Sequence, residues 1–305
     1  MDFGKGNVMK KKLFAVLMVL IMCSTCFTAC TDNNEGQRGL SSYQYDDAGK
    51  YTPGGAALTS AVNNLDIDWV SGEIEIVYHD ERTIVFSETS NREEDEQLAM
   101  RYWLDGDTLR IKFAESGNWN FGDLHKTLTV MLPADLVLNE LEIDTVSANL
   151  KAHRIAAKRA DMDTVSGWID IEEAAVSQSF NADTTSGDIT AMFAGSLGEL
   201  EIDTVSGKTQ ISVDQLGEFE INSTSGAVSL SAANAPASGE IGTVSGDVEL
   251  ILPETAEFTV EINTVSGEFD SEFSLAKNGD RYSCGSGACR YEVETTSGNI
   301  SFRLQ

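Results

Sequence analysis

The stretch LEIDTVSGKTQI, residues 200–211, recurs with few changes through more than half of this chain. Close copies are MDTVSGWIDI at 162–171, ADTTSGDIT at 182–190, IGTVSGDVEL at 241–250, INTVSGEF at 262–269 and VETTSGNISF at 293–302. Aligned on its first Thr or Ser, the phrase gives eight equivalent positions: Thr145, Thr164, Thr184, Thr204, Ser223, Thr243, Thr264 and Thr295. The first seven lie 19 to 21 residues apart and the last step is 31. A period near 20 residues predicts a stacked repeat architecture.

Each copy alternates apolar and polar residues on both sides of the phrase, which is the pattern of β-strands. The phrase itself predicts a corner, because Gly permits backbone conformations that a Cβ disfavours. We therefore expect an all-β, single-stranded β-solenoid, similar to a parallel β-helix, with coils of about 20 residues over 141–305 and a β-rich N-terminal cap over 61–140. In such a stack the threonines form a structural ladder. The alternative is a β-sandwich of hairpins, since periodicity alone does not determine strand direction.

The residue before the aligned Thr is Asp in four successive copies, from Asp144 to Asp203, and then changes to Asn, Gly or Glu. A column of carboxylates could ligate calcium through hard oxygen atoms. The spacing, however, differs from that of calcium-binding nonapeptide repeats. Dilution of the charge in later copies favours a column that limits its own repulsion, so no metal site is predicted.

The N-terminus predicts export and lipidation. Three lysines precede the apolar run LFAVLMVLIM, which is too short for a transmembrane helix and is typical of a signal peptide. The following Phe27-Thr28-Ala29-Cys30 resembles a bacterial lipobox. We therefore expect a lipoprotein signal peptide over 1–29, a lipidated Cys30, and a flexible polar tether over 30–60. The alternative is an ordinary signal peptide that carries a chance cysteine.

Charge and cysteines limit the partners. The chain has 49 Asp and Glu against 21 Lys and Arg, a net charge of −28, which repels nucleic acid. A basic cluster at 151–159 is either a solvated surface or a docking patch for a wall polymer or a partner protein. Cys284 and Cys289 flank four small residues, and in an exported protein they are candidates for a disulfide. A two-thiolate metal site would need further ligands.

The sequence contains no HExxH motif, no Gly-rich phosphate loop ending in Lys, and no GxSxG elbow. The three histidines lie in unrelated segments. We therefore predict no catalytic residues and no cofactor. A carbohydrate-active enzyme remains an alternative, because β-helices host polysaccharide-cleaving enzymes and acidic pairs are abundant here.

The T-[VT]-S-G repeats, the Leu-Pro after an apolar strand and the lipoprotein signal together resemble the DUF4097 family of candidate bacterial adhesins. The resemblance spans about 60–305 and implies a β-solenoid outside the cytoplasmic membrane. We therefore expect a non-catalytic, membrane-anchored lipoprotein of the cell envelope with an adhesin-like binding or scaffolding role. Its partners would be the membrane, through the lipid, and a wall polymer, glycan or envelope protein. The alternative is a regulatory lipoprotein that modulates envelope-stress signalling.

Overall fold

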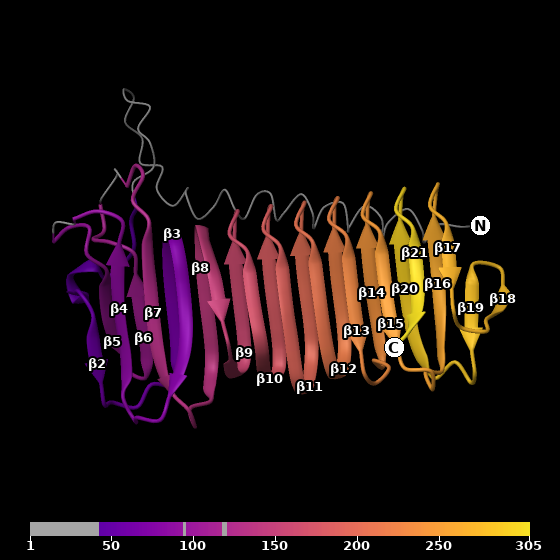
Figure 1. The fold of residues 1–305 in the computed structure, drawn as a ribbon, viewed down its shortest axis with the longest axis horizontal. Coiled ribbons are helices and arrows are strands. Elements are labelled where there is room, and N and C mark those ends of the chain that lie inside the picture. Colours follow the sequence, from indigo (N-terminus) through magenta and orange to yellow (C-terminus); the bar gives the residue numbers. More distant parts are fainter. Residues whose placement is uncertain (1–42, 94–95, 118–120) are drawn as a thin grey trace.

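The computed structural model describes residues 43–93, 96–117 and 121–305, and within them it contains β-strands and one short 3-10 helix but no α-helix. The strands form one continuous, largely parallel sheet of 21 strands that is drawn out along a single axis (Figure 1). No helix among the described residues is long and apolar enough to cross a membrane.

The stack begins with β3 and continues in chain order to β15. Its strands are β3 (Asn64–His79), β8 (Leu138–Ala152), β9 (Ile155–Thr164), β10 (Ile169–Thr184), β11 (Ile189–Thr204), β12 (Thr209–Ser223), β13 (Val228–Ala232), β14 (Ser238–Thr243) and β15 (Val248–Leu252). β8 pairs in parallel with β3, and from β9 to β15 each turn of chain pairs in parallel with the turn 19 or 20 residues earlier, so that Thr184 lies between Thr164 and Thr204. The predicted parallel ladder is therefore confirmed here, and the sandwich of hairpins is wrong, because hairpins would give antiparallel neighbours.

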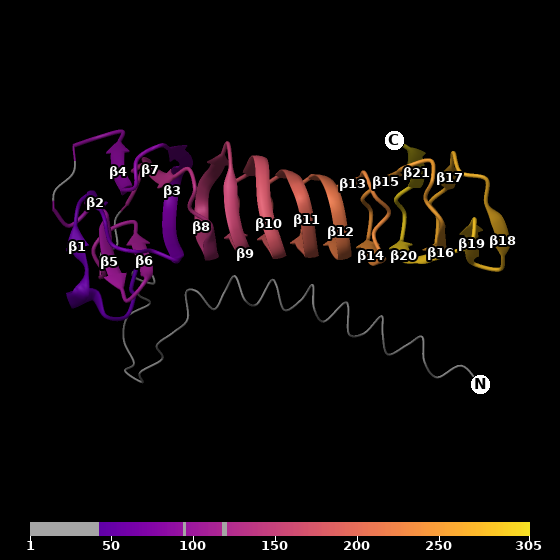
Figure 2. The ribbon, with the colours of Figure 1, turned by 90° about the horizontal axis from the view of Figure 1, so that it is seen from below.

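Apolar side chains on alternate positions fill the interior between the two sheet faces. Ile143, Ile202, Ile221 and Ile241 from the strands before the corner are all at most 1% exposed, as is Leu230 from a strand after it. Phe180 and Phe193 pack edge to face with ring centroids 4.9 Å apart. Seen from below, the strands follow one another as successive layers along the long axis (Figure 2).

The T-x-S-G phrase bends the chain through a repeated hydrogen-bond arrangement. The Thr184 hydroxyl accepts a bond from the Gly187 amide at 2.8 Å, and Thr204 does the same for Gly207 at 3.1 Å. The serine hydroxyl donates to a carbonyl of the preceding layer, as from Ser206 to Thr185 at 3.2 Å. These bonds satisfy the buried polar groups of the corner and tie each layer to its neighbour.

Ala148 replaces the glycine in the first clear copy, and the chain there does not bend as it does elsewhere. β8 runs as strand through residues 146–149, and its neighbour β3 also continues through its own Ser71-Gly72. In the later copies the same positions are bends between two strands. The chain of the first clear copy is therefore straighter than that of the later copies.

Antiparallel strands cover the N-terminal end of the stack. They are β1 (Thr52–Pro53), β2 (Ala56–Leu58), β4 (Ile84–Ser90) and β5 (Arg101–Asp105), preceded by the 3-10 helix η1 (Ala48–Lys50). They pair outward from β6 (Thr108–Lys112) and β7 (Lys126–Pro133), both of which lie parallel to β3. Lys126, 1% exposed, lies beneath this cap with its ammonium 2.6 Å from Glu88.

The sequence predicts residues 43–60 as part of a flexible tether. This prediction is wrong, because the segment packs against the cap. The Tyr43 hydroxyl accepts a hydrogen bond from the Phe113 amide at 3.0 Å, and Tyr51 packs edge to face on Trp103. The composition of the segment is polar on average, but its aromatic side chains bury apolar area against the cap. The signal peptide predicted over 1–29 lies outside the described residues.

The C-terminal layers do not follow chain order. Their strands are β16 (Phe258–Thr264), β17 (Phe269–Ser271), β18 (Ala276–Asn278), β19 (Arg281–Cys284), β20 (Cys289–Thr295) and β21 (Ile300–Leu304). β20 pairs with β14 on one side and with β16 on the other, and β21 lies between β15 and β17. Thr295 therefore follows Thr243 in the ladder, with their hydroxyl oxygens 2.9 Å apart, and Thr264 comes last. The expectation that Thr264 stacks directly on Thr243 is wrong.

Candidate functional site: a carboxylate-lined face with a groove

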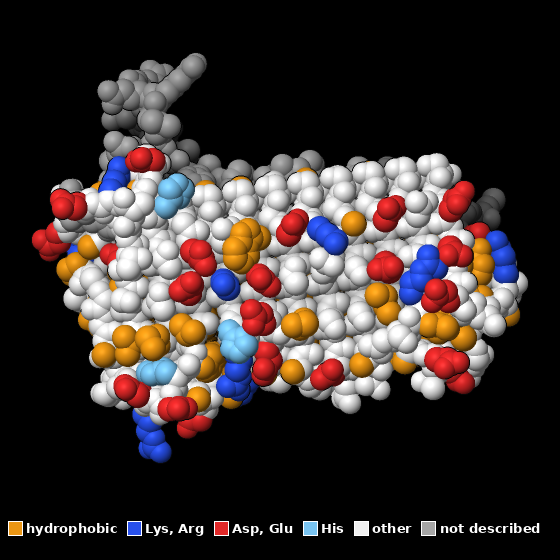
Figure 3. Space-filling view, in the orientation of Figure 1, with side chains coloured by type: hydrophobic (Ala, Val, Ile, Leu, Met, Phe, Trp, Pro, Cys, Tyr) orange, Lys and Arg blue, Asp and Glu red, His pale blue; other side chains and the backbone are white. Residues whose placement is uncertain are grey.

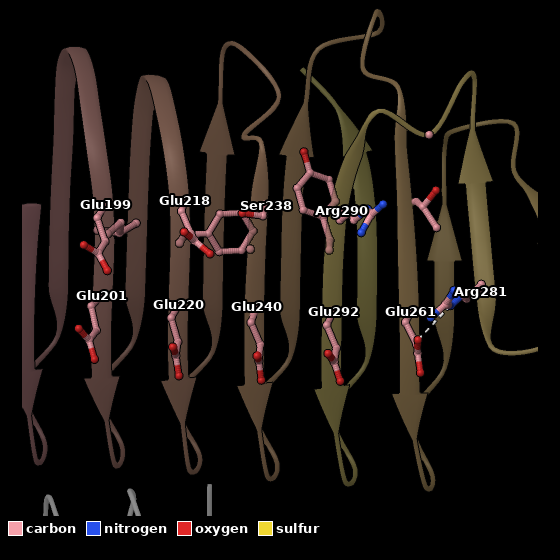
Figure 4. Close-up of a pocket in the computed structure, with 16 residues that line it drawn as sticks. Glu199, Glu201, Glu218, Glu220, Ser238, Glu240, Glu261, Arg281, Arg290 and Glu292 are labelled. Atoms are coloured by element: carbon pink, nitrogen blue, oxygen red, sulfur yellow. Dashed lines mark hydrogen bonds and ion pairs between the residues drawn. The ribbon is translucent and has the colours of Figure 1, made fainter. Parts of the chain in front are cut away.

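The strands that lead into the corner carry two outward rows of acidic side chains. The first row is the residue before the aligned Thr, namely Asp68, Asp144, Asp163, Asp183, Asp203, Asn222, Gly242, Glu294 and Asn263 in spatial order. The second row, two residues earlier, is Asp66, Glu142, Asp161, Asn181, Glu201, Glu220, Glu240, Glu292 and Glu261. Figure 4 shows the last five of these glutamates side by side. By contrast, acidic and basic side chains are interspersed on the face drawn in Figure 3.

The carboxylates of the first row lie one layer apart, about 4.8 Å, so that like charges are close together. Partial burial and the neighbouring Asp68 raise the pKa of Asp144 to about 8. Partial burial, together with Asp163 and Asp203, raises the pKa of Asp183 to about 7. Partial burial and the nearby Asp161 raise the pKa of Asp163, which is more exposed, to about 6. These carboxyl groups are therefore partly protonated near neutral pH, because burial and neighbouring like charges both disfavour the ionised form.

Neutral and basic side chains relieve the repulsion at both ends of the rows. Near the cap, the ammonium of Lys112 contacts both Asp66 and Asp68. At the other end, Asn263 donates to Glu294 at 3.0 Å, and the Arg281 guanidinium lies 3.1 Å from Glu261. Over β9 to β12 the neutral Asn181 and Asn222 interrupt the two rows, and the other row positions there are carboxylates.

A groove of about 670 Å³ hollows this face where β11, β12, β14, β20 and β16 lie side by side. Its walls are the glutamate row and a second line that includes Glu199, Glu218 and Arg290, as Figure 4 shows. The line is interrupted by Ser238, whose short side chain leaves space. Beneath it, Gly239 is required for packing, because a Cβ there would lie 2.2 Å from the ring of Phe219. The groove thus combines many acceptors with two arginine donors.

Two of the three histidines lie away from the groove. His79 bonds the carbonyl of Thr83 at 2.7 Å, His153 lies 2.5 Å from Glu172, and neither belongs to the groove. Within the described part of the chain, no group of three or more His, Cys, Asp or Glu side chains is arranged to hold a metal ion. The basic cluster is largely paired, with Arg154 near Glu173 and Arg159 near Glu140.

The residues predicted from the sequence have different outcomes. The eight ladder positions come together as one column, although in a different order from that of the chain. Cys30 lies outside the described residues. The groove residues Glu218, Glu240 and Arg290 were missed, because their alternation with buried residues is shared by every exposed strand position and carries no functional signal.

The structure contradicts the predicted disulfide: Cys284 and Cys289 are both free. In the sheet, both are aligned with Phe258, one on each edge of β16. Two strand spacings amount to about 9.6 Å, whereas disulfides need Cα atoms within about 7 Å. Chain proximity was therefore misleading, because β16 lies between the two cysteines.

The family model described as Toastrack DUF4097 matches residues 57–303, which cover most of the cap, the stack and the groove. The chain belongs to the Toastrack DUF4097 family. The resemblance carried by the T-[VT]-S-G repeats is thereby confirmed. Comparison of this Toastrack chain with curated proteins finds no match.

Three solved structures resemble the Toastrack chain at low identity. A candidate cell adhesion protein of Clostridium sporogenes is 11% identical, with 83% of this chain and 100% of that chain covered and a TM-score of 0.21. A candidate adhesin of Bacteroides fragilis is 12% identical, with 81% and 95% covered and a TM-score of 0.44. A candidate adhesin of Parabacteroides distasonis is 12% identical, with 83% and 97% covered and a TM-score of 0.41.

Proposed function

We propose that this protein is a non-catalytic, lipid-anchored protein of the bacterial cell envelope whose β-solenoid presents the groove face to a binding partner. The observation that carries the proposal is the groove on a rigid stack of parallel strands, with seven glutamates and two arginines along it. Repeat stacks of this kind offer extended, preformed surfaces and commonly serve as binding scaffolds. The adhesin-like role, proposed first from the family resemblance, is consistent with this geometry.

The groove proposal predicts a charge-sensitive interaction. The purified protein is applied to arrays of cell-wall polymers, glycans and extracellular matrix proteins, and the strongest binder is titrated. Glu218 is exposed on the groove wall, so Glu218→Lys is expected to weaken that binding about tenfold or more through altered electrostatic complementarity.

The matched control is Asp170→Lys, which makes the same charge change on β10 beyond the corner and outside the groove. Its binding should remain within about twofold of the unchanged protein. Equal losses for the two variants would show that net charge, not the groove, governs binding. Hydrolysis of any arrayed polymer by the protein would contradict the non-catalytic role.

Lipid anchoring depends on Cys30 in the lipobox-like Phe27-Thr28-Ala29-Cys30. Cells expressing the full chain are grown with an alkyne analogue of palmitate. We expect labelling of the unchanged protein, loss of labelling in Cys30→Ala, and retention in the control Cys26→Ala. Equal labelling of the unchanged protein and Cys30→Ala would refute the anchor and leave the groove proposal to its own test.

A further inference from the structure

The last strand pair of the chain is inserted between two layers that are already connected to each other. Residues 253–257 lead directly from β15 to β16, yet β20 and β21 separate these layers along their whole length. Figure 1 shows the C-terminal strands, in yellow, on the inner side of β16. We call the space that β20 and β21 occupy between these two layers the slot.

Without β20 and β21, the layers on either side of the slot could pair directly with each other, with little change in the ladder. Thr243, Thr295 and Thr264 are equivalent members of the repeat, and so are the glycines Gly246, Gly298 and Gly267. If β20 and β21 left, β16 and β17 could pair with β14 and β15 by the same register that the repeat provides. That arrangement is the chain order that the repeat alone predicts.

One side chain favours the observed order of layers, with β20 between β14 and β16, over the order in which β16 pairs with β14. Tyr291 of β20 lies beside Gly239 of β14, is 4% exposed, and donates its hydroxyl to the Pro236 carbonyl at 2.8 Å. Its ring lies 5.9 Å from that of Phe219, which fills the space that Gly239 leaves. In the alternative order Val260 would stand beside Gly239. Valine is smaller and has no donor for Pro236, so a void and an unpaired carbonyl would result.

The two thiols distinguish the two orders. The turn from Cys284 to Cys289 passes around the start of β16, where the Cys289 amide donates to the Glu257 carbonyl at 3.0 Å and Ser286 bonds the Glu257 carboxylate. The cysteines lie on opposite edges of β16 at the level of Phe258, which is 0% exposed. Once β20 leaves the slot, β16 no longer separates them, and a linker of four small residues lets the sulfurs meet.

We propose that residues 289–304 form an exchangeable insert, and that a disulfide between Cys284 and Cys289 traps the form in which the insert has left its slot. The oxidant is a small-molecule disulfide, RSSR. One cysteine thiolate attacks RSSR and releases one RS⁻, and the other displaces the second RS⁻ from the mixed disulfide. Two protein thiols are oxidised and one RSSR is reduced to two thiols. Reduction by a dithiol reverses the step and allows reinsertion.

The test uses the full chain with Cys23→Ser, Cys26→Ser and Cys30→Ser, so that only the C-terminal pair can react. It is incubated with excess oxidised glutathione, and the intramolecular disulfide is followed by mass. Tyr291→Val removes the ring and the hydroxyl that hold the insert, and should speed disulfide formation about tenfold or more. Tyr291→Phe keeps the ring and should fall between this variant and the parent. Cys284→Ser should form none.

Amide hydrogen exchange then identifies the trapped form. We expect the disulfide form to lose protection over 289–304 while β10, β11 and β12 keep theirs. Equal disulfide rates in the parent and Tyr291→Val, or no disulfide in either, would overturn the proposal. So would a disulfide form that retains protection over 289–304, or one that has lost protection throughout the stack, since the latter reports global unfolding.

Discussion

Replacing Gly187 with alanine is expected to lower the free energy of unfolding by about 3 kcal/mol, at the upper end of the usual cost of overpacking. A Cβ at this position would lie 1.7 Å from the carbonyl oxygen of Gly167 in the layer below. That atom belongs to the backbone of the adjacent layer, so it cannot rotate away as a side chain would. The layers must separate locally, which also strains the bond between the Gly187 amide and the Thr184 hydroxyl.

The measurement is urea unfolding followed by circular dichroism, with Gly49→Ala as the control. Gly49 lies in η1, and a Cβ there would meet no atom within 4 Å. We expect the midpoint of Gly49→Ala to match the unchanged protein. A Gly187→Ala midpoint that also matched would show that the corner does not require glycine, and the steric account of the repeated phrase would fail.

Replacing Asp183 with asparagine is expected to raise the free energy of unfolding at pH 8 by about 2 kcal/mol. Partial burial, together with Asp163 and Asp203 in adjacent layers and with Asp161 and Glu201 nearby, raises the pKa of Asp183 from 3.8 to about 7. Asparagine keeps the shape and the hydrogen-bonding capacity without the charge. The sequence makes the same exchange at Asn181, between Asp161 and Glu201 of the second row.

The pH dependence has a definite sign. Because the folded-state pKa of Asp183 is higher than the unfolded value, the folded protein binds the proton more tightly. This contribution to stability is fully present below about pH 4 and is lost as the pH rises through about 7. The raised pKa values of Asp144 and Asp163 act in the same direction. We therefore expect Asp183→Asn to stabilise the protein more at pH 8 than at pH 5.

Urea unfolding at the two pH values checks this, with Asp170→Asn as the control. Asp170 is an outward carboxylate on the strand beyond the corner, where its partners in the sheet are Lys151 and Thr190 rather than carboxylates. We expect little or no stabilisation from that change. If Asp183→Asn gave the same stabilisation at pH 5 and pH 8, the repulsion along the row would not be its cause.

The repeated phrase favoured the parallel stack and its ladder, although periodicity alone left the sandwich of hairpins open. A threonine whose hydroxyl caps the Gly amide three residues later is a local device, and copies of it 19 to 21 residues apart fit together only when like stacks on like. Glycine is required wherever the next layer approaches, which explains its recurrence and the straighter chain at Ala148. The stacking of the threonines and the need for glycine both depend on neighbours at a constant separation along the chain. Both can therefore be predicted from the periodicity of the sequence.

The order of the last layers was decided by tertiary structure alone. Thr264 and Thr295 are equivalent as repeats, so no local pattern distinguishes which lies on Thr243. The observed order depends on how well Tyr291 fits beside Gly239. These two residues are 52 positions apart, and no sequence pattern indicates that they are in contact. The groove and the separation of the two cysteines follow from that choice. Packing complementarity between distant side chains is not periodic, and for this reason the sequence by itself left it open.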